Sequence, residues 1–287
     1  MGSVGLTGGL YPVPPTVTST TDISAYTSDE IRTLTAKQIG GLTTAQVRSI
    51  TTDALAGLTS RQIQSLTTRS VNALTTDQIQ GLTAGQLNAL SHTQVGTLSS
   101  DQLNALTTDQ INGLRPGQIA AFDTAEIGAI ATSQLTQLSS SQIQVLTASQ
   151  LRNLTGAQVA ALTTDQVASL KSAQVKAIET ADLRAFLTEQ IAALSRTQLA
   201  ALTYSQVAAL ATGQVAAIET RDLSAMTAGQ ITTMDSDQLR ALSTEQIVSL
   251  APKQIAAMGL DLAELTTDQL HALTPAQMAV LHRLLLA

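Results

Sequence analysis

The chain has 287 residues, enough for one or two domains of ordinary size, but only 2% of them are aromatic and none is tryptophan. The core must therefore be built from aliphatic side chains. A formal charge of −6 with scattered Lys and Arg argues against a nucleic-acid or anionic-membrane partner, and the absence of cysteine excludes disulfides and thiolate metal sites.

The N-terminal segment, residues 1–25, is rich in Gly, Pro and Thr and contains YPVPPTV. This composition predicts an extended arm with a short polyproline-like piece. Since no basic stretch precedes an apolar run, we expect no cleavable secretory signal. No segment approaches the roughly 18 apolar residues of a membrane helix, so no membrane span is predicted.

From Tyr26 onward an eight-residue phrase repeats, as in LTTDQIQGL at 74–82. Counting the leading apolar residue as position 0, the phrase recurs at every eighth residue as far as Met258. A continuous helix would need apolar residues about every 3.6 positions, and a β-solenoid would need strict alternation. Because apolar positions 0, 5 and 7 fit neither, the period predicts a new short helix in each octad.

Each octad carries its own signals for a helix start. Position 1 is usually Thr and position 4 usually Gln, as in Thr75 and Gln78, which is the pattern of a capping box. Position 0 and position 5, here Leu74 and Ile79, stand where a hydrophobic staple forms. Asp or Glu is frequent at position 3, inside the first turn, where the helix dipole favours negative charge.

The prolines of the repeats, Pro116, Pro252 and Pro275, all stand at position 2, the first helical residue, where a missing N–H is tolerated. A helix confined to one octad is far shorter than the roughly 12 residues at which isolated helices become marginal, so neighbouring units must stack. We therefore predict an all-α solenoid of short capped helices, one per octad, over residues 26–280. Positions 3 and 6 should face solvent.

Some octads carry an acid where the others carry Gln, in AAFDTAEIGAI, AIETADLRAF, AAIETRDLSAM and the shortened AAMGLDLAEL. The substituted residues are Glu126, Asp182, Asp222 and Asp261, with Asp123, Glu179 and Glu219 close to the cap of the first three. One interpretation is a row of cation or partner contacts along one edge. We favour the other, a variant capping residue inherited through duplication of a block of five octads.

The C-terminal segment breaks the pattern. One residue is missing in MGLDLAE, after which Leu265, Leu273 and Leu281 resume the series. Residues 281–287 are rich in leucine, with Leu284, Leu285 and Leu286, and are predicted to form either an apolar end or a cap that packs back on the last octads. An arm at one end and an apolar surface at the other would allow self-association, head to tail or by exchange of the arm.

The sequence offers no catalytic, cofactor-binding or metal-binding residues, and it predicts no cofactor and no small-molecule substrate. His92, His271 and His282 stand at unrelated octad positions; His271 and His282 could share one end, but we interpret all three as solvated surface residues. The Gln column is explained by capping. Tyr204 is expected to be exposed, without other aromatic anchors for a recognition surface.

The octads, such as LTTAQV at 42–47 and LTTDQV at 162–167, resemble the L-T-T-x-Q-[IV]-x-A-L tandem repeats of large bacterial surface or secreted proteins, some of them labelled as adhesion or haem-utilisation exoproteins. The resemblance covers roughly residues 26–280. It implies a bacterial, extracellular, structural or adhesive role, and it brings no defined haem-binding residue.

Taken together, these features predict a non-enzymatic structural protein, a self-assembling subunit of an extracellular bacterial filament or surface structure. The alternative is a monomeric adhesin stalk or protein-interaction scaffold, which could be a fragment of a longer repeat protein. Self-association separates the two, because only the first requires it.

Overall fold

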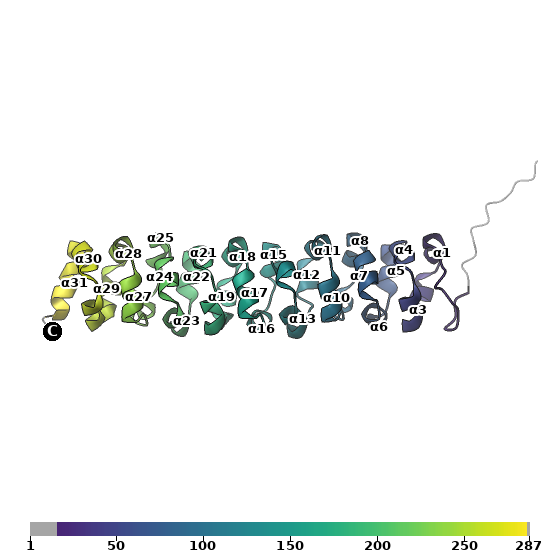
Figure 1. The fold of residues 1–287 in the computed structure, drawn as a ribbon, viewed down its shortest axis with the longest axis horizontal. Helices are drawn as coiled ribbons and strands as arrows, with labels where there is room; N and C mark the ends of the chain where they lie inside the picture. Colours follow the sequence, from purple (N-terminus) through teal and green to yellow (C-terminus); the bar gives the residue numbers. More distant parts are fainter. Residues whose placement is uncertain (1–15, 286–287) are drawn as a thin grey trace, which may run out of the picture. The chain divides into compact units, whose positions relative to one another are not determined.

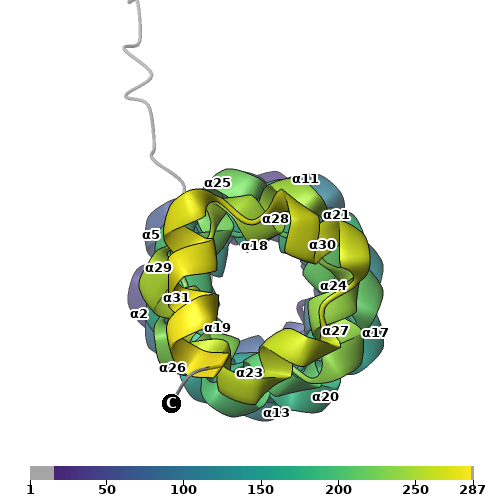
Figure 2. The ribbon, with the colours of Figure 1, turned by 90° about the vertical axis from the view of Figure 1, so that its left-hand side faces the viewer.

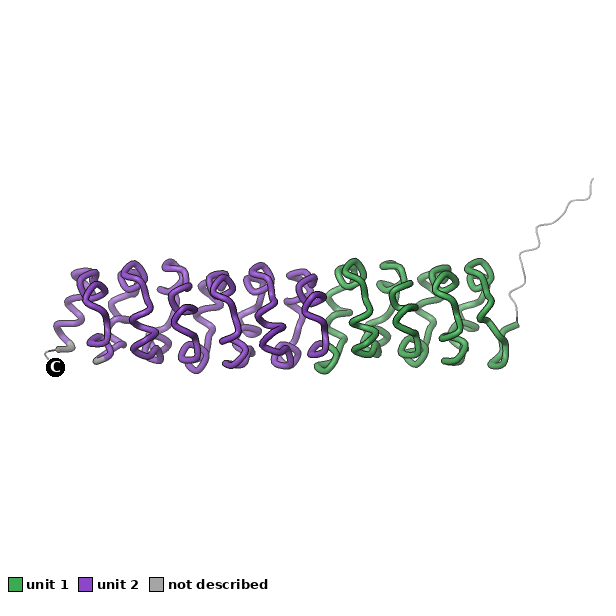
Figure 3. Tube along the Cα trace, viewed as in Figure 1, with its two compact units in different colours: residues 1–126 green, residues 127–287 purple. Residues whose placement is uncertain are grey.

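The computed structural model describes residues 16–285. The chain divides into two compact units, residues 1–126 and 127–287, which Figure 3 colours green and purple. Both units consist of short helices joined by tight connections, and the described residues contain no β-strand. The predicted all-α solenoid with one short helix per octad is confirmed.

The helices of unit 1 follow one another octad by octad (Figure 1). Their bounds are α1 Ser28–Arg32, α2 Ala36–Gly40, α3 Thr44–Ser49, α4 Thr52–Ala56, α5 Ser60–Ser65, α6 Thr68–Asn72, α7 Thr76–Gly81, α8 Ala84–Ala89, α9 His92–Val95, α10 Ser100–Ala105, α11 Thr108–Gly113 and α12 Pro116–Ile119. Helix α13, Thr124–Gly128, contains the junction with unit 2.

Unit 2 continues the same series. Its helices are α14 Thr132–Leu135, α15 Ser140–Ile143, α16 Ala148–Arg152, α17 Gly156–Ala161, α18 Thr164–Ser169, α19 Ser172–Ala177, α20 Thr180–Arg184, α21 Thr188–Ala192, α22 Arg196–Ala201, α23 Tyr204–Ala209, α24 Thr212–Ala216, α25 Thr220–Leu223, α26 Ala228–Ile231, α27 Ser236–Ala241, α28 Thr244–Ser249, α29 Pro252–Met258, the 3₁₀ helix η1 Gly259–Glu264, α30 Thr267–Ala272 and α31 Pro275–Leu285.

Helix α7 shows why each helix begins and ends where it does. The Gln78 N–H donates to Thr75 Oγ1 at 3.2 Å, and the Thr75 N–H donates to Gln78 Oε1 at 2.9 Å, so both halves of the predicted capping box are present. The next leading residue, Leu82, returns to an extended conformation with φ −68° and ψ 135° and ends the helix. Pro116, Pro252 and Pro275 open α12, α29 and α31, as predicted.

The staple positions form the core. Leu74 and Ile79 are 4% and 0% exposed, and the leading residue and position 5 are buried in this way along both units. Full burial of such a side chain stabilises the fold by about 1.5–3 kcal/mol relative to exposure. Since each octad contributes two of these side chains, the apolar core forms only when successive turns stack on one another.

Sequence separations between packed segments give the length of a turn. Within unit 1, α4 packs against both α1 and α7, the third helix in each direction. The Gln78 amide reaches back 28 residues to Ile50 and 31 residues to Val47. One turn therefore takes about 28 residues, or three and a half octads, and the helices of unit 2 follow one another around a ring (Figure 2). The block of five octads that separates Asp182 from Asp222 is not a whole number of such turns.

Residues 16–25 pack on unit 1, although they belong to the segment predicted as an extended arm. Ile23 is only 1% exposed. The Gln46 amide donates to the carbonyl oxygens of Thr18 and Thr21 at 2.8 and 2.9 Å. These residues thus take the place of a preceding turn beneath α3. The rest of the predicted arm, residues 1–15, lies outside the described residues.

The C-terminal helices depart from the octad scheme. Gly259, with φ 55°, ends α29 in a left-handed conformation that glycine adopts easily, and η1 replaces the shortened octad. Helix α31 then runs through Leu281, which was predicted to open a new octad; His282 follows it in place of a capping Thr or Ser, so nothing restarts the helix. The side chains of Leu284, Leu285 and Leu286 lie outside the described residues.

Candidate functional site

The most repeated polar group, the position-4 glutamine, bridges two helices. Gln78 is 3% exposed; its Oε1 serves the capping box of α7, while its Nε2 donates to Val47 O at 2.8 Å and Ile50 O at 2.7 Å. Those carbonyls belong to the C-terminal end of α3, one turn earlier. Each such glutamine therefore satisfies the start of its own helix and the end of a helix in the preceding turn.

The sequence predicted only the first of these two roles. A capping box accepts Glu as readily as Gln, and the positive end of the helix dipole favours Glu. Only an amide can also donate to carbonyl oxygens, so the preference for Gln over Glu was the missed signal. Glu30 agrees with this explanation, because it closes the capping box of α1, the first described helix, and is not buried.

Among the described residues, few buried side-chain polar atoms lack a hydrogen-bond partner. Gln206, for example, is 2% exposed, accepts from the Thr203 N–H at 2.8 Å and donates to Val175 O and Ile178 O at 2.9 and 2.7 Å. Both of its N–H donors are used, and its burial leaves no access for a ligand. Asn88 Oδ1 is an exception, a buried acceptor that receives no hydrogen bond.

The first acidic octad keeps its capping box. The Asp123 N–H donates to Glu126 Oε2 at 2.7 Å, and the Glu126 N–H donates to Asp123 Oδ1 at 3.0 Å. The backbone N–H of Glu126 lowers the pKa of Asp123, whereas burial raises the pKa of Glu126. The interpretation as a variant cap is confirmed at this octad.

The same interpretation is wrong for the octads of α20 and α25. Neither Glu179 nor Glu219, at the N-cap, makes a side-chain cap hydrogen bond, and neither helix has a capping box. The physical reason is length: Asp182 and Asp222 are one methylene shorter than Gln and do not reach back to the N-cap N–H. Asp261 is exposed in η1 and does not belong to this group.

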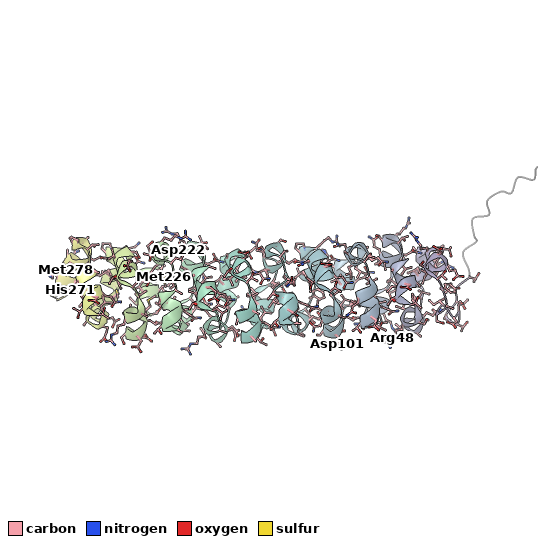
Figure 4. The ribbon with its side chains drawn as sticks, turned by 45° about the horizontal axis from the view of Figure 1, so that its top comes forward. Arg48, Asp101, Asp222, Met226, His271 and Met278 are labelled. Carbon is pink, nitrogen blue, oxygen red and sulfur yellow. The ribbon has the colours of Figure 1, made fainter. Side chains whose placement is uncertain are left out.

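The carboxylates of Asp182 and Asp222 differ in their surroundings. Burial, and then the charge of Glu179, raises the pKa of Asp182. The Asp222 side chain, labelled in Figure 4, is 8% exposed and accepts a hydrogen bond from Arg221 Nε at 3.4 Å, while Arg221 also pairs with Glu219 at 2.7 Å. A carboxyl group has no N–H, so neither side chain can donate to the preceding turn as the glutamine amide does.

The remaining candidates are separate surface residues. His92, His271 and His282 are exposed, and within residues 16–285 no group of three or more His, Cys, Asp or Glu is placed to hold a metal ion. Tyr204 is 60% exposed, as predicted, beside a groove of about 340 Å³. No helix in the described part of the chain is long and apolar enough to cross a bilayer.

Comparison with known families supports the repeat. Four stretches, residues 37–68, 84–116, 175–212 and 215–252, match the family model of the ALTTAQ repeat. The matches fall in both units and agree with an octad tandem-repeat family. No curated protein sequence matches the chain. The chain is therefore similar to ALTTAQ-repeat sequences over these four stretches.

Proposed function

We propose that the protein is a non-enzymatic scaffold, a repeat solenoid that displays exposed side chains at fixed spacing outside a bacterial cell. The glutamine column is the observation that carries this proposal. Its amides hold the turns together and are consumed by doing so, which leaves the outward positions as the variable part of each octad. Such a chain is suited to presenting groups rather than to transforming a substrate.

We favour a monomeric scaffold over the filament subunit that the sequence suggested first. Residues 16–25 occupy the place beneath α3 that a second copy would have to use. At the other end, α31 packs against α29 and η1. Both observations support ends that are covered by the chain's own segments, and a non-closing contact between copies would need them open.

Mass measurement separates the two functions. We expect full-length protein to elute as a monomer of 29.8 kDa in size-exclusion chromatography with light scattering, over a hundredfold range of concentration, and to form no filaments in negative-stain electron microscopy. A variant lacking only residues 1–15 keeps the packed segment 16–25 and is the matched control. Filaments that vanish in this variant would support exchange of the arm, and filaments in both would support end-to-end contact.

The extracellular location rests on the resemblance of the octads to repeats of bacterial surface and secreted proteins. Labelling of intact producing cells with an antibody against the purified protein tests it. We expect signal on intact cells or in the medium; signal that appears only after lysis would contradict this part of the proposal.

A further inference from the structure

Positive charge is concentrated in the first turns of unit 1. Between residues 32 and 76 there is a single acid, Asp53, although the chain as a whole carries −6. The cations of this stretch are Arg32, Lys37, Arg48, Arg61 and Arg69. Arg48 is labelled in Figure 4 and uses its Nε to donate to Ala73 O at 3.1 Å. The total charge of the chain concealed this local excess.

Three of these cations line one groove. Arg32, Lys37 and Arg61 surround a space of about 450 Å³ between α1, α2 and α5, together with Thr35 and Thr59. All three are exposed, and no acidic residue lines the groove. Among the ion pairs of the described residues, none involves these three side chains. Their charges therefore face solvent without a protein partner.

A second groove begins on the other end of α5. Gln64 stands three residues after Arg61, so both lie on one face of the helix. With Asn88 and Arg115 it lines a space of about 530 Å³, again without an acid or an aromatic ring. Asn88 lines this space, and its Oδ1 is buried and receives no hydrogen bond.

The register of the turns aligns the two grooves. Arg32, Arg61, Asn88 and Arg115 follow one another at separations close to the 28 residues of one turn. Arg115 is exposed, although its Nη2 also donates to Leu90 O at 3.2 Å. The stripe thus runs along unit 1 and combines cations with a buried acceptor that lacks a donor.

We propose that this stripe, formed by Arg32, Lys37, Arg61, Gln64, Asn88 and Arg115, binds an acidic polysaccharide. Sugar carboxylates would pair with the cations. A sugar hydroxyl would donate to Asn88 Oδ1 once rotation of this half-buried side chain exposed the oxygen to the groove, a contact that an ionised phosphate or sulfate group cannot make. The lack of aromatic rings disfavours single-stranded nucleic acid, which binds by base stacking. The inference deepens the proposed scaffold function and rests on it.

Binding of polygalacturonate to the full chain tests the proposal, measured by calorimetry at about 50 mM salt, with neutral dextran and oligothymidylate as comparison ligands. The triple variant Arg32→Gln, Lys37→Gln, Arg61→Gln should weaken polygalacturonate binding roughly tenfold or more. The variant Arg152→Gln, Lys176→Gln, Lys253→Gln removes the same charge from exposed positions of unit 2 and should bind normally. Asn88→Ala should weaken binding about threefold, the effect of one lost hydrogen bond.

Absence of polygalacturonate binding by the native protein would overturn the proposal. Equal losses in the two triple variants would show attraction by net charge alone, and oligothymidylate binding as tight as that of polygalacturonate would overturn the choice of a polysaccharide. Thermal unfolding of each variant shows that it is folded. Light scattering on the same samples distinguishes the failure of this inference from the failure of the proposed scaffold function. A protein that is monomeric but does not bind polygalacturonate contradicts only this inference.

Discussion

Helices α23 and α25 lie two octads apart in the same unit, and they differ at position 4. In α23, Gln206 closes the capping box and donates to the C-terminal end of α19 in the preceding turn. In α25, Asp222 does neither and is held only by Arg221. The leading residues Leu210 and Met226 are buried equally well after both helices. Apolar packing alone therefore builds an octad, and the amide adds the bonding between turns.

The largest effect should come from converting α23 into an acidic octad. Gln206→Glu keeps the acceptor oxygen but loses both donations and places a charge against two carbonyl oxygens. We expect the free energy of unfolding to fall by roughly 3 kcal/mol, because buried groups are left unpaired. Urea unfolding followed by circular dichroism measures this. Gln137→Glu, the same change at an exposed residue, is the control, and equal midpoints for the two variants would refute the bridging role.

The reverse change should stabilise α25. In Asp222→Gln the new amide can donate to the carbonyls of Ile191 and Leu194, which stand 31 and 28 residues earlier as in the other octads. We expect a gain of about 1–2 kcal/mol in the free energy of unfolding. Loss of the contact with Arg221 costs little, since that side chain is 77% exposed. Asp165→Asn on the exposed face of α18 is the control; a gain of the same size there would point to net charge instead.

The contribution of the N-cap to stability can be measured by itself at two adjacent threonines, Thr163 and Thr164. Thr163 Oγ1 accepts from the Gln166 N–H at 3.1 Å, whereas Thr164 is the exposed first residue of α18. Thr163→Ala should lower the free energy of unfolding by about 1 kcal/mol, the usual cost of losing an N-cap. Thr164→Ala should change it by less. Thermal unfolding measures both variants. Equal decreases in their midpoints would contradict the assignment of Thr163 as the N-cap.

The smallest effect concerns Asp182. Because burial raises its pKa in the folded chain, the folded state holds this proton more tightly than the unfolded state. Its contribution to stability therefore increases as the pH falls through the raised folded pKa, and it is complete below the ordinary aspartate pKa. Asp182→Asn should flatten that part of the pH dependence of thermal unfolding. Parallel curves of unfolding midpoint against pH for the native protein and the variant would show that a group other than Asp182 causes this pH dependence.

Local signals in the sequence predicted the helices well. Thr75, Gln78 and the prolines define helix starts through interactions within one octad, so a single octad contains the necessary information. The turn length could not be predicted, because it depends on which octads pack together. The bonds from Gln78 to Val47 and Ile50 arise only from that packing. The same reason explains the stripe, since the alignment of Arg32, Arg61 and Arg115 along it follows only once the turn is known.

Two interpretations failed for reasons of geometry. Aspartate at position 4 resembles a variant cap in sequence, but Asp182 and Asp222 are too short to bond to the N-cap backbone. Residues 16–25 belong to the segment predicted from its composition as an extended arm, yet Ile23 is buried. Val17 and Ile23 among the Thr and Ser residues of 16–25 gave too weak a pattern to predict that contact.

The mismatch between an eight-residue repeat and a turn of about 28 residues also bears on how such chains change through evolution. Because an octad is about two-sevenths of a turn, gaining or losing one would replace the core contacts across that point by contacts of the same kind and rotate all later surface residues of that unit about its axis. Two side chains from like positions return to the same face only after two turns, or seven octads. Replication slippage could thus reshuffle which residues share a face without altering a single buried side chain.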